Sequence, residues 1–149
     1  MTVMEACDDE NKQYPTTQAC LDLCAVMDPG EMGDQVGNSA ACREHYAVEA
    51  SEAPAQHCLS AGPTGNSICG SPCETFCAFQ AEICTGANTQ YATIQECLSE
   101  CAMFPNDVEF SASVTTGDSL ACRTYHLTVG ASNPEVHCSH IVLDSPVCL

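Results

Sequence analysis

The sequence has few basic residues and no tryptophan. It contains 3 Lys+Arg against 20 Asp+Glu, a formal net charge of −17 over 149 residues. With only Lys12, Arg43 and Arg123 as fixed cations, we expect no binding to nucleic acid or to an anionic membrane surface. Because the acidic residues are scattered, we interpret them as a solvated, self-repelling surface. A surface that binds cations or a cationic partner is the alternative.

Long apolar runs are also missing. No run approaches the roughly 18 residues of a transmembrane helix, so no membrane span is expected. The N-terminal segment 1–7 lacks the basic start and the apolar core of a signal peptide. Since a disulfide protein must be exported, we expect its signal to have been removed or to lie outside this numbering.

Cysteine, in contrast, is abundant, at 14 of 149 residues. This density is typical of a disulfide scaffold in an oxidising compartment, which predicts an extracellular or cell-surface protein. The Cys-x-x-Cys spacing of zinc knuckles is absent, and the close pairs are Cys-x-x-x-Cys, one helical turn apart on one helix face. Disulfides are therefore favoured over metal–thiolate sites. The expected framework contains Cys7, Cys20, Cys24, Cys42, Cys58, Cys69, Cys73, Cys77, Cys84, Cys97, Cys101, Cys122, Cys138 and Cys148.

One pattern occurs twice along the chain. Residues 11–25 recur 77 positions later as 88–102, with matching Asn, Gln, Tyr, Thr and Cys residues. Two further blocks recur at an offset of 80: 37–43 as 117–123, and 54–58 as 134–138. The order of these matches indicates two tandem modules of roughly 75 residues, which we place at 1–70 and 71–149.

The predicted fold is small, disulfide-rich and mainly α-helical, with irregular loops. A capping box, Ser71-Pro72-Cys73-Glu74, predicts a helix over 72–84. Other helices are expected at about 17–27, 40–49, 92–103 and 120–129, the 40–49 and 120–129 helices beginning after the N-cap residues Ser39 and Ser119. The segments after Pro54 and Pro134 are predicted to be irregular. No stretch alternates as a strand would.

The cysteine spacing raises a question about the first module. In the second module, a helical hairpin would pair Cys73 with Cys101 and Cys77 with Cys97. At the 77-residue offset, the first-module counterparts of Cys73 and Cys77 would fall before Met1, so its first helix is predicted to be missing. Cys20 and Cys24 would then bond elsewhere in the chain or to a neighbouring subunit. A head-to-tail link between subunits would form rings or filaments.

Five histidines are candidate metal ligands. His57 and His137 follow the same repeated proline, and His45 and His126 lie one position out of register in the two modules. His140 is the fifth. Matched histidines suit a divalent metal or an axial haem ligand. The alternative is a structural role, with the imidazoles hydrogen-bonded to backbone near a disulfide.

No catalytic residue is predicted. Ser39 and Ser119 are explained as helix N-caps, and no Gly-x-Ser-x-Gly motif accompanies them. Arg43 and Arg123 occupy matched positions after a cysteine. We interpret their guanidinium groups as structural donors to carboxylates or helix-end carbonyls, with ligand binding as the alternative.

The strings Cys84–Tyr91, Cys97–Ala102, Gly117–His126 and Pro134–His140 resemble a cysteine-rich repeat of predicted secreted proteins and lipoproteins of myxobacteria and their relatives. The first module departs from this repeat, because His45-Tyr46 is inverted and Leu59-Ser60 replaces the final histidine. The resemblance implies a surface location and no particular activity.

These observations favour a non-catalytic extracellular structural protein, a cell-surface or filament-forming subunit that self-associates. No cofactor is expected in that case. The competing hypothesis is a metal- or haem-binding electron-transfer protein that uses the repeated histidines.

Overall fold

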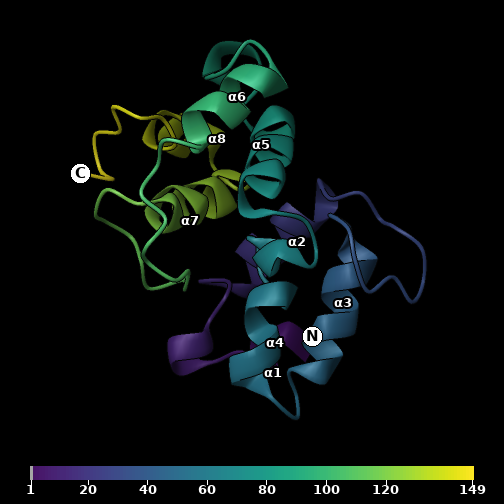
Figure 1. The fold of residues 1–149 in the computed structure, drawn as a ribbon. Helices are drawn as coiled ribbons and strands as arrows, with labels where there is room; N and C mark the ends of the chain where they lie inside the picture. Colours follow the sequence, from purple (N-terminus) through teal and green to yellow (C-terminus); the bar gives the residue numbers. More distant parts are fainter. Residues whose placement is uncertain (1) are drawn as a thin grey trace.

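The computed structural model describes residues 2–149. The first module contains four α-helices: α1 (Thr2–Ala6), α2 (Thr17–Ala25), α3 (Ala40–Glu49) and α4 (Pro54–Ala61). Two short 3-10 helices, η1 (Asp9–Asn11) and η2 (Gly65–Ser67), complete it. In Figure 1 these elements fill the lower half of the molecule.

The second module repeats this order with α5 (Pro72–Ile83), α6 (Ile94–Cys101), α7 (Leu120–Gly130) and α8 (Pro134–His137). Its 3-10 helices are η3 (Gly86–Asn88) and η4 (Cys138–His140). Across residues 2–149 there is no strand, only an isolated bridge between Asp28 and Ser39. The mainly helical, disulfide-rich fold that the sequence predicts is therefore confirmed.

Helix boundaries follow local capping chemistry. The Ser71 side chain accepts from the Glu74 N–H while Glu74 accepts from the Ser71 N–H, which closes the predicted capping box. Ser39 and Ser119 accept from the N–H groups of Cys42 and Cys122, so both are N-caps. These side chains satisfy amide groups that the first helical turn leaves without partners.

Two sequence expectations were wrong. The segments after Pro54 and Pro134 are helical, because proline at the first helical position supplies a suitable φ angle and leaves no hydrogen bond unmade. The first module also begins with a helix, α1, where none was predicted. At the 77-residue offset, α1 corresponds to 79–83, the last five residues of α5.

Within the described part of the chain, six disulfides hold the modules together internally. Two bridges are common to both modules: Cys7–Cys58 corresponds to Cys84–Cys138, and Cys42–Cys69 corresponds to Cys122–Cys148. The second module adds Cys73–Cys101 and Cys77–Cys97, the pairing predicted for a helical hairpin. So many disulfides indicate an oxidising, extracytoplasmic compartment.

The two modules share one hydrophobic core. Helix α2 of the first module contacts α7 of the second, and α5 contacts η2. The Thr75 hydroxyl donates to the Thr64 carbonyl across this junction, and the Ala112 N–H donates to the Lys12 carbonyl at 2.7 Å. Of the helices described, none is long and apolar enough to span a bilayer.

Candidate functional site

The first module has an open apolar face on α2. It borders a cavity of about 390 Å³. We use "open face" for the residues that line this cavity: Val3, Tyr14, Cys20, Leu21, Cys24, Met27, Ala40, Arg43, Glu44, Ala47 and Ala61. Leu21 is 48% exposed there.

In the second module the corresponding face is covered by α5. Cys97 and Cys101, the counterparts of Cys20 and Cys24, are bonded to α5 and are at most 2% exposed. Phe104, which stands where Met27 stands in the first module, packs edge-on against Phe76 of α5 with ring centroids 5.9 Å apart. The two modules thus present the same face in a covered and in an open form.

Cys20 and Cys24 are not among the twelve cysteines of the six disulfides in the described residues, so whether the framework includes all fourteen cysteines stays a prediction. The counterparts of Cys20 and Cys24 bond to the first half of α5, and α1 corresponds to the end of that helix. Burial, reinforced by the neighbouring Cys24, raises the pKa of the Cys20 thiol to about 11. Cys24 is exposed.

The repeated arginines are structural. Arg123 is fully buried and donates to the carbonyls of Ser119, Val142 and Leu143. It also forms a 2.8 Å ion pair with Asp118. Arg43 makes the corresponding set of contacts, donating to the carbonyls of Ser39, Gly62 and Pro63. Each guanidinium fork therefore ties a helix start to the loop after α4 or η4, as predicted.

Three of the five candidate histidines converge in the second module. His126 is on α7, His137 ends α8 and His140 ends η4. The Nδ1 atom of His126 lies 3.1 Å from Nδ1 of His137 and 3.3 Å from Nδ1 of His140. The ligand nitrogens of all three rings lie within 4.8 Å of one another. We call these three residues the histidine cluster.

Neighbouring groups orient His126 and lower the pKa of two rings of the histidine cluster. The His126 Nε2 atom is 3.0 Å from the Thr115 carbonyl, a hydrogen bond in which Nε2–H donates and Nδ1 keeps its lone pair. Burial lowers the pKa of His126, and the adjacent His140 lowers it further. Burial also lowers the pKa of His137, with contributions from His126 and His140. The Thr115 carbonyl could not have been identified from the sequence, since a backbone acceptor leaves no signature in residue type.

His45 and His57 form no such cluster. Tyr46 stacks on His57 with centroids 5.8 Å apart, and His45 packs against the edge of the same Tyr46 ring. At the 80-residue offset, the first-module counterparts of the histidine cluster are Tyr46, His57 and Ser60. The first module thus has one histidine where the second has three, and its described ring contacts do not gather His45 and His57 as a ligand pair.

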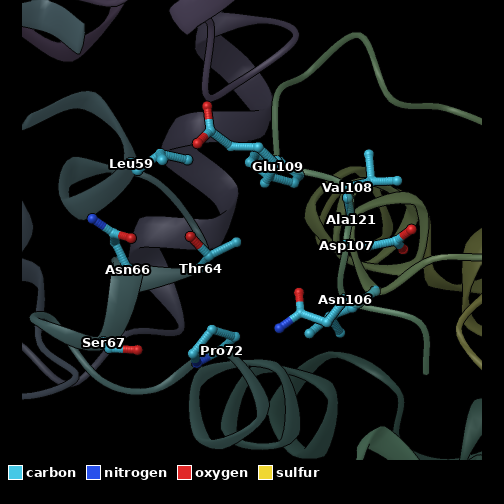
Figure 2. Close-up of a pocket in the computed structure, with 12 residues that line it drawn as sticks. Leu59, Thr64, Asn66, Ser67, Pro72, Asn106, Asp107, Val108, Glu109 and Ala121 are labelled. Atoms are coloured by element: carbon cyan, nitrogen blue, oxygen red, sulfur yellow. The ribbon is translucent and has the colours of Figure 1, made fainter. Parts of the chain in front are cut away.

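A second cavity, of about 380 Å³, lies between the modules (Figure 2). Leu59, Thr64 and Asn66 border it from the first module, and the loop 106–110 borders it from the second. Two acidic side chains line it, but in Figure 2 the carboxylates of Asp107 and Glu109 point apart. This cavity therefore offers no convergent ligand set.

The comparisons with known proteins are consistent with the internal repeat. The model of a protein family described as "BfoA family C-terminal domain" matches residues 1–74 and again residues 71–144. Neither a curated protein sequence nor a solved structure matches the chain significantly.

Proposed function

Since the chain belongs to the BfoA family and carries two tandem copies of its C-terminal domain, the copies can be compared position by position, and from that comparison we propose a structural role. The protein would be a non-catalytic, cell-surface subunit that links covalently to a second copy of itself through the open face of the first module. The observation that supports this most directly is the exposed Cys24 beside an apolar cavity that has a covered counterpart in the second module.

The second module shows what such a face accepts. There, a helix with Cys-x-x-x-Cys lies antiparallel to a second helix with the same motif, and the first cysteine of each bonds to the last of the other. An apolar side chain, Phe76, fills the space between them and is 1% exposed. An occupant of the open face should therefore be a helix with two cysteines one turn apart and an apolar neighbour.

Helix α2 itself meets this description. It carries Cys20 and Cys24 one turn apart, with the half-exposed Leu21 on the open face. Two α2 helices packed antiparallel across a two-fold axis would bring Cys24 of each copy next to the α2 cysteines of the other. A two-fold contact of this kind is self-complementary, so one surface per chain is enough to build it. Growth into a filament would need a second contact surface as well.

The chemistry of the link is ordinary disulfide exchange. The Cys24 thiolate attacks a sulfur of an oxidised dithiol donor, and a thiolate of the second copy then displaces the donor as a dithiol. The two protein thiols together lose two protons and two electrons, which the donor accepts. An oxidising compartment supplies such donors. Packing of the two apolar faces would hold the copies together before the bond forms.

The test is oxidation of the purified protein with oxidised glutathione, followed by non-reducing electrophoresis and mass spectrometry. We expect a reduction-sensitive dimer whose cross-linked peptide contains Cys24, and no such species from Cys24→Ser. A ladder of higher species would also support self-association and would indicate the second surface that a filament requires. A monomer that persists at micromolar concentration would contradict the proposal.

A matched pair of variants separates docking from random collision. Leu21→Glu places a charge on the open face, whereas Ile94→Glu places one on α6 at a residue of nearly equal exposure, 47% against 48%. Leu21→Glu should slow cross-linking at least about tenfold, while Ile94→Glu should leave the rate unchanged, because only Leu21 lines the cavity. Equal rates for the two variants would show that Cys24 reacts without docking.

A further inference from the structure

We propose that the histidine cluster of the second module is a binding site for one late first-row divalent transition metal ion, Zn²⁺ or Cu²⁺ in particular. The site would hold the ion through Nδ1 of His126, His137 and His140 and would leave one coordination position open. This proposal is independent of the covalent association proposed above, since it concerns a different module and different side chains.

Two of the three nitrogen separations match those of one tetrahedral ion, and the third is within 4.8 Å. Zinc–imidazole bonds of about 2.0–2.1 Å place two ligand nitrogens of a tetrahedron roughly 3.3–3.4 Å apart. The observed separations from His126 Nδ1 are 3.1 Å and 3.3 Å. A hydrogen bond places one proton between two of these nitrogens, whereas a bound ion can be shared by all three.

The cluster also has the supporting contact that metal-binding histidines usually have. The His126 Nε2–H donates to the Thr115 carbonyl, so Nδ1 of that ring faces the cluster as a lone pair. His137 and His140 can hold their protons on Nε2, which directs their Nδ1 lone pairs to the same point. All three ligands would then be neutral imidazoles, the form that binds divalent metals.

Disulfides anchor the segments that carry the ligands. Cys138 lies between His137 and His140 and is bonded to Cys84 of α5. Cys122, one turn before His126 on α7, is bonded to Cys148. Because these two sulfurs are already bonded to each other, Cys122 and Cys148 are not ligands, although both lie beside His126. A site built on such fixed elements is organised before the ion arrives.

The choice of metal follows from the ligand type. Three imidazoles without a carboxylate suit Zn²⁺, Cu²⁺ and Ni²⁺ better than Mg²⁺ or Ca²⁺, which take oxygen ligands. His137 and His140 are half-buried, so solvent can reach the ion and occupy the fourth position. The net charge of −17 raises the local concentration of cations around the protein.

The first module provides a built-in control. It has the same helices and the corresponding disulfides, but Tyr46, His57 and Ser60 stand where the histidine cluster stands in the second module. A single imidazole at His57 cannot hold an ion tightly. His57→Gln is therefore the matched control for His137→Gln.

The experiment is titration of the metal-free, oxidised protein with Zn²⁺ in competition with a chromophoric chelator. The Cys24→Ser background removes the exposed thiol, which could itself bind zinc. We expect one Zn²⁺ per chain, and a dissociation constant at least about 100-fold higher in His126→Gln, His137→Gln or His140→Gln. His57→Gln and His45→Gln should bind as tightly as the background protein.

A Co²⁺ titration gives a second readout that does not depend on affinity alone. Tetrahedral Co²⁺ absorbs far more strongly in the visible than six-coordinate Co²⁺, so the intact cluster should give an intense band that each cluster variant loses. The non-reduced mass and the far-ultraviolet circular dichroism of each variant check that its disulfides and fold are intact. Absence of stoichiometric Zn²⁺ binding in the Cys24→Ser background, or an equal loss in His57→Gln, would overturn the proposal.

Discussion

Reaction of α2 with an aromatic disulfide reagent should occur in two well-separated steps. Burial raises the pKa of Cys20 from an ordinary value of 9.0 to about 11, so at pH 8 its thiolate fraction is about 100-fold lower than that of an unperturbed thiol. A more basic thiolate is also more nucleophilic, which raises its reaction rate roughly eightfold over two pKa units. The two effects together slow the reaction of Cys20 by about 12-fold. The side chain is also only 7% exposed, which adds a steric delay.

The assay follows release of the chromophoric thiol at pH 8 and identifies each modified peptide by mass. Cys24 should react first, because it is exposed, and Cys20 should follow at least about tenfold more slowly. Below its pKa the Cys20 rate should rise about tenfold per pH unit, since each unit multiplies its thiolate fraction by ten. Reaction of both cysteines at one rate, or a Cys20 rate that does not change between pH 8 and pH 10, would refute the burial and the raised pKa of the Cys20 thiol.

Four substitutions test the packing that supports both sites, each measured as the free energy of unfolding of the oxidised protein in urea. Arg123→Met should cost about 3 kcal/mol and Arg43→Met about 2 kcal/mol, at roughly 1 kcal/mol for each buried carbonyl left without a donor. The two costs differ because the third guanidinium–carbonyl distance is 2.9 Å for Arg123 and 3.5 Å for Arg43. Equal costs would contradict this reasoning. Phe76→Ala should cost about 3–5 kcal/mol, since the ring is 1% exposed and covers the face that is open in the first module; a cost below 1 kcal/mol would show that the ring is not needed there. Ser71→Ala should cost about 1 kcal/mol through loss of the capping box, and a neutral result would mean that proline alone defines the start of α5.

Much of this architecture could be predicted from the sequence, because it depends on local chemistry. N-cap serines and threonines, proline at the first helical position and the repeat of 77 to 80 residues predict most helices and the two-module organisation. The Cys-x-x-x-Cys spacing predicts the Cys73–Cys101 and Cys77–Cys97 hairpin, since antiparallel helices bring sulfurs one turn apart into matching positions. The helices after Pro54 and Pro134 were missed although proline stands at the first helical position of each, because neither has a side chain that caps its N-terminus and α8 is only 4 residues long.

The two sites were decided only by the tertiary structure. From the sequence all five histidines are equivalent candidates. Convergence of His126, His137 and His140 depends on how α7 packs against α8 and η4, which brings together rings 11 and 14 residues apart along the chain. Likewise, Cys20 and Cys97 have the same local sequence, and only the presence of α5 on one face distinguishes them. Local spacing determines which side chains share a helix face, whereas long-range packing determines what lies opposite that face.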